Sequence, residues 1–121
     1  MNITVSGSAG APHASQIDVH VHISATMNVT AFVARRKVNG LLLDRVGTGL
    51  YTDEPELVMS DQRMCWRVPV ILALPTLGRL GQVGTVEVDV QSGEVLADEI
   101  TWQEMSEHAE RLVVGATLQT E

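Results

Sequence analysis

The sequence has little of several features that would each point to a class of protein. A single cysteine excludes an intramolecular disulfide framework and is typical of a reducing compartment. Basic residues are few: 8 Lys and Arg against 15 Asp and Glu give a net charge of -7, which argues against nucleic acid as the main partner. No apolar run approaches the roughly 20 residues that cross a bilayer, and no basic segment followed by an apolar one indicates a signal peptide. We therefore expect a cytoplasmic protein that binds neither nucleic acid nor a membrane.

Aromatic residues are also scarce, at 3% of the chain, although hydrophobic residues reach 45%. The core must therefore consist mostly of Val, Leu, Ile and Met. A chain of 121 residues is long enough to bury such a core in one domain. Because the first residues are mostly small and polar, we predict an N-terminal arm over residues 1–16 and a single domain over residues 17–121.

The strongest strand signal lies in residues 64–73, where large apolar side chains alternate with other types. Trp66 is the largest residue of the apolar face, and we expect it to be substantially buried. Residues 75–81 contain Pro and Gly and predict a loop, after which residues 86–90 resume the alternation. A short loop with Gly93 then leads to a last strand, so the economical interpretation is an antiparallel meander.

The end of this meander resembles the closing hairpin of PepSY-like domains, on the residues Val88-Asp89-Val90-Gln91-Ser92-Gly93-Glu94-Val95-Leu96. In those domains a strand that ends in Val-Asp-Ala is followed by Thr-Gly-Glu-Val. The present chain has Val90 and Ser92 where Ala and Thr are usual. The resemblance implies the peptidase-inhibiting role that is proposed for PepSY-like domains, which are usually secreted or membrane-tethered.

Two further strands are predicted outside the central stretch. Residues 17–23 alternate strictly between apolar and polar types, which is typical of an amphipathic strand. Residues 56–59, which follow Pro55, are a candidate for a short strand. Residues 60–63 would then turn the chain back into the central strand.

A first helix is predicted over residues 28–46 from apolar residues at helical spacing. Thr26 or Asn28 is its candidate N-cap, and Gly47 or Gly49 is the candidate for its end. Its apolar side is predicted to comprise Val29, Phe32, Val33, Leu42, Leu43 and Val46.

A competing signal lies inside this helix. Asn39-Gly40 is also typical of a hairpin turn, and glycine inside a helix costs about 1 kcal/mol relative to alanine. We favour the helix, because its flanks favour helix and the segment is too long for one strand.

The second helix has the clearest N-terminal signal. Thr101 and Glu104 form a capping box, in which the hydroxyl and the carboxylate each satisfy an amide of the first turn. An apolar stripe follows, comprising Trp102, Met105, Ala109, Leu112, Val113 and Ala116. The predicted fold class is therefore α+β: an antiparallel meander sheet of about four or five strands with two helices packed on one face.

Two histidines are the candidates for a metal site. His20 and His22 lie two positions apart on a predicted strand, so both project from the same face, and His13 is a candidate third ligand. Asp18 is the one acidic residue nearby at ligand spacing. The competing interpretation is the polar face of an amphipathic strand that contains two histidines by chance. No cofactor is otherwise indicated.

Other reactive residues lack the neighbours that chemistry requires. His108 lies one turn from Glu104, a spacing that suits either acid–base work or an ordinary solvated helix face. Cys65 has no nearby His or Asp at a spacing that indicates an activated thiol, and we expect a buried, unreactive one. The glycines of residues 78–84 neither precede a helix nor include the Lys-Ser/Thr of a phosphate loop. The basic cluster at residues 35–37 is expected to lie on a solvated face of the first helix.

These observations favour a non-catalytic binding or interaction module over an enzyme. We expect a homo-oligomer, because the predicted sheet has apolar residues on both faces, as at Val70 and Ile71, while two helices cover only one. An N-terminal arm exchanged between copies would satisfy a bare sheet edge, and a protein partner is the other association we expect. The alternative function is a small metal-binding protein or enzyme that uses His20 and His22.

Overall fold

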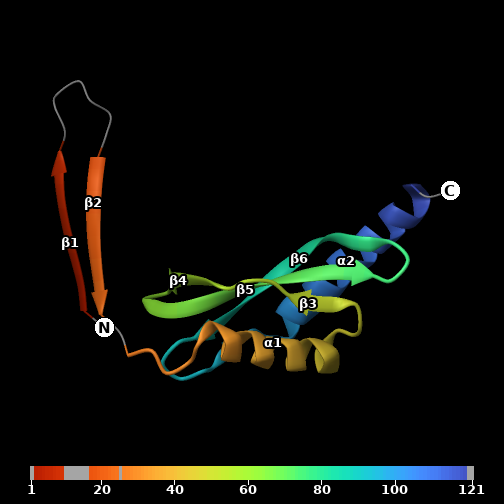
Figure 1. Ribbon diagram of the computed structural model, residues 1–121, viewed down its shortest axis with the longest axis horizontal. Helices are drawn as coiled ribbons and strands as arrows, with labels where there is room; N and C mark the ends of the chain where they lie inside the picture. Colours follow the sequence, from red (N-terminus) through yellow and green to blue (C-terminus); the bar gives the residue numbers. More distant parts are fainter. Residues whose placement is uncertain (1, 10–16, 25, 120–121) are drawn as a thin grey trace.

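The computed structural model describes residues 2–9, 17–24 and 26–119 of the chain. Its elements in chain order are β1 (Asn2–Ala9), β2 (Ile17–Ser24), α1 (Ala31–Arg45), β3 (Leu50–Thr52), β4 (Glu56–Ser60), β5 (Arg63–Leu74), β6 (Gly78–Asp89), β7 (Val95–Leu96) and α2 (Glu99–Gln119). Five strands form one antiparallel sheet and both helices pack on it, which confirms the predicted α+β class (Figure 1). Among the described residues, neither helix combines the length and the apolar character that a bilayer crossing requires.

Strand β5 is the centre of the five-stranded sheet, in which the strands follow the order β3-β5-β6-β7. The first part of β5 pairs with β4 and a later part pairs with β3, so two short strands share one side of a long one. The β4–β5 turn uses Asp61 and Gln62 at φ values of 48° and 64°, and a two-residue hairpin of type I′ needs positive φ at both positions. The predicted meander runs from β4 to β7, and β3 is an addition that the sequence did not indicate.

Strand β6 is longer than the sequence suggested, because residues 78–81 of the predicted loop belong to the sheet. Two register shifts interrupt its pairing with β5, and the register passes over Leu80 and Val83. Such bulges let a strand bend without leaving the sheet. Gly84 has a packing reason to be glycine, since a Cβ there would stand 3.2 Å from Cε of Met105 in α2.

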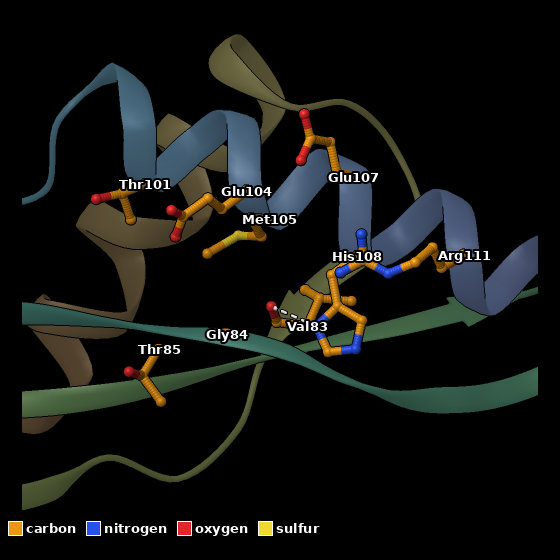
Figure 2. A pocket seen from close by; sticks show the side chains of 9 residues that line it. All are labelled: Val83, Gly84, Thr85, Thr101, Glu104, Met105, Glu107, His108 and Arg111. Atoms are coloured by element: carbon orange, nitrogen blue, oxygen red, sulfur yellow. Dashed lines mark hydrogen bonds between the residues drawn. The ribbon is translucent and has the colours of Figure 1, made fainter.

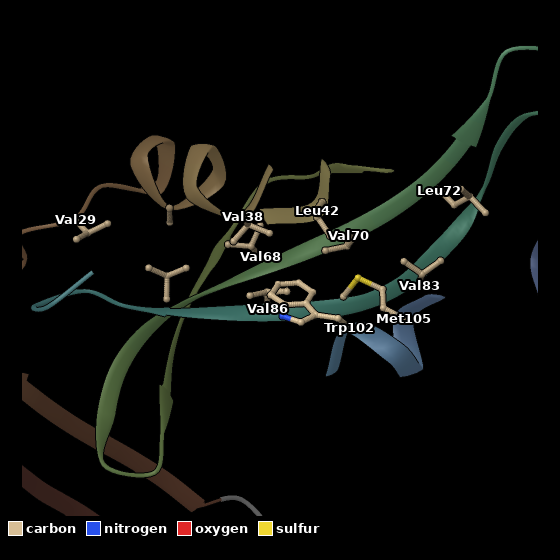
Figure 3. Close-up of a cluster of buried hydrophobic side chains, with 12 residues drawn as sticks. Val29, Val38, Leu42, Val68, Val70, Leu72, Val83, Val86, Trp102 and Met105 are labelled. Atoms are coloured by element: carbon tan, nitrogen blue, oxygen red, sulfur yellow. The ribbon is translucent and has the colours of Figure 1, made fainter. Parts of the chain in front are cut away.

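The hydrophobic core lies between the sheet and the two helices (Figure 3). Strands β5 and β6 supply mainly valines, α1 supplies Val38 and Leu42, and α2 supplies Trp102 and Met105. Trp66 lies on the face that the alternation predicted, but it is only partly buried because it packs at the rim of this core.

Helix α1 turns a narrow line of residues toward the sheet. Its buried residues are Ala34, Val38 and Leu42, which are spaced by four and therefore lie on one side of the helix. The sequence assigned Phe32 and Leu43 to the apolar side, and this prediction is wrong, since they are 67% and 66% exposed. A residue next to Leu42 in the chain is rotated by about 100° around the helix axis and cannot reach the same surface.

Both helices begin with side-chain caps at residues other than those predicted. Thr30 caps α1 by accepting the N–H of Val33 at 3.2 Å, and the uninterrupted helix includes Asn39-Gly40. In α2 the cap is Asp98, whose carboxylate accepts the N–H of Thr101 at 2.9 Å. The Thr101 hydroxyl lies 3.4 Å from the Asp98 N–H in return. Thr101 is therefore the second member of the capping box and not the first, which moves the start of α2 toward the N-terminus.

The N-terminal strands form a sheet of their own. β1 and β2 pair antiparallel along their 8 residues each, and Figure 1 shows this hairpin standing apart from the helices and from the five-stranded sheet. The strand predicted over residues 17–23 is confirmed as β2. β1 lies within the segment that the sequence suggested to be a small polar arm, and its strand conformation depends on its pairing with β2.

Candidate functional site

The predicted metal ligands belong to the N-terminal hairpin. His20 and His22 are two positions apart in β2, as the metal hypothesis requires. Their side chains lie outside the described part of the structure, and so does the whole of His13. Within the described part, no three His, Cys, Asp or Glu side chains come together as a metal centre. The metal hypothesis therefore stays a prediction.

A polar pocket lies between α2 and β6 (Figure 2). Its volume is about 360 Å³, and its lining consists of Val83, Gly84, Thr85, Thr101, Glu104, Met105, Glu107, His108 and Arg111. The helix contributes the charged groups, and the strand contributes small residues below them. The pocket thus contains the pair formed by Glu104 and His108 that the sequence singled out for acid–base chemistry.

His108 is oriented by the sheet and not by Glu104. Its Nδ1 lies 3.2 Å from the carbonyl oxygen of Val83, which the β6 bulge leaves out of register. Because a carbonyl oxygen only accepts, Nδ1 is the donor of this hydrogen bond. No described hydrogen bond joins His108 to Glu104, and Figure 2 shows the Glu104 carboxylate extending away from the ring. The pocket offers an oriented imidazole without the carboxylate partner that the acid–base hypothesis requires.

Cys65 is a core residue with no accessible surface. Burial raises the pKa of its thiol, and the carboxylates of Glu87 and Asp89 raise this pKa further. A thiol in such surroundings stays protonated near neutral pH and is a weak nucleophile. The predicted burial of Cys65 is confirmed.

The basic cluster of α1 is engaged within the chain. Arg35 donates to both the hydroxyl and the carbonyl oxygen of Thr52 in β3. Lys37 donates from Nζ to the carbonyl oxygen of Gly93 at 2.8 Å. These two side chains fasten α1 to β3 and to the loop before β7, so they serve the fold.

An apolar surface is exposed where β4 pairs with β5. The register sets Leu57 opposite Trp66 and Met59 opposite Met64, so the four residues share one face of the sheet. Leu57 and Met59 are 42% and 37% exposed, while Met64 and Trp66 are partly buried. Neither helix packs extensively on β4, since α1 packs on β3 and β5 and α2 packs on β6. We call these four residues the β4 surface.

The chain that enters α1 runs beside the β4 surface. Nε1 of Trp66 donates to the carbonyl oxygen of Val29 at 2.7 Å, and the N–H of Val29 donates to the carbonyl oxygen of Val90 at 3.0 Å. These two bonds hold residue 29 against the sheet. The sequence did not indicate the β4 surface, although the alternation of Leu57 and Met59 was a signal for it, because the partner of a strand is unknown before the register is known.

No protein-family model matches the chain, and neither a curated protein nor a solved structure matches it. The PepSY-like resemblance of residues 88–96 therefore stays a prediction.

Proposed function

We propose that the protein is a non-catalytic interaction module that works as a homo-oligomer and uses its N-terminal hairpin for assembly. The observation that carries this proposal is the position of the hairpin. β1 and β2 pair only with each other among the described strands, outside the sheet that the helices cover. An isolated two-stranded hairpin is at best marginally stable in water, so this hairpin needs a surface from elsewhere.

The register of the hairpin separates two classes of residue. Apolar residues of β2 are paired with apolar or small residues of β1: Ile23 with Ile3, Val21 with Val5, Val19 with Gly7 and Ile17 with Ala9. Polar residues are paired with polar residues at the alternate positions. Since paired positions of an antiparallel ladder share a face, the register assigns the apolar residues to one face of the hairpin. An apolar face of this length is typical of a buried contact.

The His108 pocket also supports a binding module better than an enzyme. Its imidazole is held by a backbone carbonyl, and the nearby carboxylate of Glu104 does not orient it. Cys65 has no surface from which to attack a substrate. Neither His108 nor Cys65 therefore has the partner groups that covalent catalysis uses.

The test is the mass of the full-length protein in solution. Light scattering at micromolar concentration should give a dimer or a larger assembly for the wild type, and Val21→Asp should reduce this to the mass of one chain. His20→Asp is the matched control, because it makes the same replacement at the neighbouring position, which pairs with Ser6 instead of Val5. A monomeric wild type, or a Val21→Asp variant that stays assembled, would overturn the proposal.

The alternative function is metal binding through His20 and His22. The observation that favours it is the strand conformation of β2, since residues two apart in a strand share a face. Elemental analysis of untagged protein checks it: stoichiometric zinc, copper or nickel that is lost in a variant with both His20→Ala and His22→Ala would favour a metal protein. Absence of bound metal after incubation with each ion would exclude it.

A further inference from the structure

We infer that the β4 surface of one copy receives the β1–β2 hairpin of a second copy, and that the exchange is reciprocal. This inference rests on the proposed self-association and names the site to which the hairpin binds. Two features of the described chain carry it: the exposed apolar residues of the β4 surface, and the short connection between the hairpin and that surface.

The β4 surface has the chemistry that the apolar face of the hairpin requires. Leu57 and Met59 are 42% and 37% exposed in a chain that includes the hairpin, so the hairpin does not cover them within its own copy. Trp66 and Met64 extend the same face inward along β5. Aromatic residues and methionine are enriched at protein interfaces.

The connection places the hairpin close to the β4 surface. β2 ends at Ser24, and Val29 is held against Trp66 by the bond from the indole N–H. Five steps of extended chain span at most about 17 Å. Each hairpin is therefore anchored at the rim of the β4 surface of its own chain. Two copies related by a two-fold axis near this rim can exchange hairpins, and every contact then occurs twice.

The size of such a contact is compatible with a specific dimer. The two strands of the hairpin have 8 residues each. At about 3.3 Å per residue and about 5 Å per strand, one face measures roughly 26 Å by 10 Å. Two reciprocal contacts with two sides each bury on the order of 1,000 Å², which is about the lower bound for a biological interface.

The first experiment compares two exposed leucines in the full-length protein. Leu57→Glu should reduce the assembly to the mass of one chain, whereas Leu43→Glu on α1, at 66% exposure, should leave the wild-type mass unchanged. Circular dichroism verifies that both variants fold. If the wild type is assembled and Leu57→Glu remains so, this inference fails while the proposed function stands. If the wild type is monomeric, both fail.

A second experiment distinguishes exchange between copies from closure within one copy. One preparation carries Val21→Cys and another carries Leu57→Cys, and Cys65 adds no background because it is buried. After mixing and cross-linking with a short bifunctional maleimide, a covalent dimer that contains one chain of each kind is expected. A chain that carries both cysteines and cross-links only within itself, at the mass of one chain, would overturn the exchange.

Discussion

The protein contains two antiparallel β structures that resemble each other in sequence and differ in what covers them. Strands β2 and β6 both contain alternating apolar and polar residues. The apolar residues of β6 lie in the core under α2, whereas β2 has only β1 beside it in the described structure. Alternation therefore specifies a strand with two different faces, but the cover for the apolar face comes from elsewhere in the chain or from another chain.

The largest effect on stability is expected in the core that the two helices cover. Leu42 is 1% exposed, and the next residue of α1, Leu43, is 66% exposed. Leu42→Ala should lower the free energy of unfolding by about 2–5 kcal/mol, the usual loss for a truncated core leucine. Leu43→Ala should change it by less than about 0.5 kcal/mol. Urea denaturation gives both values, and equal losses would show that α1 does not turn Leu42 toward the sheet.

The next effect concerns a turn of the covered region. Asp89 is 9% exposed, and its Oδ1 accepts the N–H groups of Gln91 at 2.8 Å and Ser92 at 3.0 Å. Asp89→Ala should lower the free energy of unfolding by about 1.5–3 kcal/mol, the range for hydrogen bonds to a charged group. Asp89→Asn keeps an acceptor oxygen and should recover part of this loss. An Asn variant as unstable as the Ala variant would refute the acceptor role.

The contribution of the Asp89 carboxylate to the free energy of unfolding is expected to depend on pH. The N–H of Ser92 holds the pKa of Asp89 below its ordinary value, and the N–H of Gln91 and the charge of Arg63 act in the same direction. A carboxyl group with a lowered folded-state pKa stabilises the fold fully above its unfolded pKa of about 3.9, and this contribution is lost as pH falls through the folded pKa. The stability difference between wild type and Asp89→Ala should therefore shrink in acid. A difference that is independent of pH would contradict this.

A smaller effect is expected at the start of α2. The Thr101 hydroxyl accepts the N–H of Asp98 at 3.4 Å and donates to the Asp98 carboxylate at 3.0 Å, and Thr101→Ala removes both hydrogen bonds. The free energy of unfolding should fall by about 0.5–1 kcal/mol, the low end for a lost cap, because Asp98 still accepts the amide of residue 101. Thr101→Ser keeps the hydroxyl and serves as the control. A Ser variant that loses as much as the Ala variant would exclude the hydroxyl as the cause.

The smallest effect on stability is expected in the hairpin. At concentrations low enough for the wild type to be monomeric, Val21→Asp should change the free energy of unfolding of the five-stranded domain by less than about 0.5 kcal/mol, the usual limit for a residue outside a core. Its large effect should be on assembly alone. A loss of several kcal/mol would contradict the distinction between the two β structures, because it would show that the hairpin belongs to the same core.

Several features of the protein follow from residues that are close in the chain, and these were predictable. Alternation indicated β2 and the central strand β5, and the short loop with Gly93 indicated the last hairpin. The stripe on α2 also needed only helical periodicity, and Trp102 and Met105 are buried as expected. Local spacing determines these features because each depends on the geometry of one strand, one helix or one turn.

Other features depend on contacts between distant residues, and only the tertiary structure decided them. Leu42 and Leu43 are equally apolar, and the position of α1 on the sheet decided that Leu42 is the buried one. Only the folded structure brings Nδ1 of His108 within 3.2 Å of the carbonyl oxygen of Val83, which lies at a bulge of β6. The β4 surface exists because of the register between β4 and β5 and because neither helix packs extensively on β4. Sequence sets the faces of each element, and the packing of remote elements decides which of those faces remains open to a second molecule.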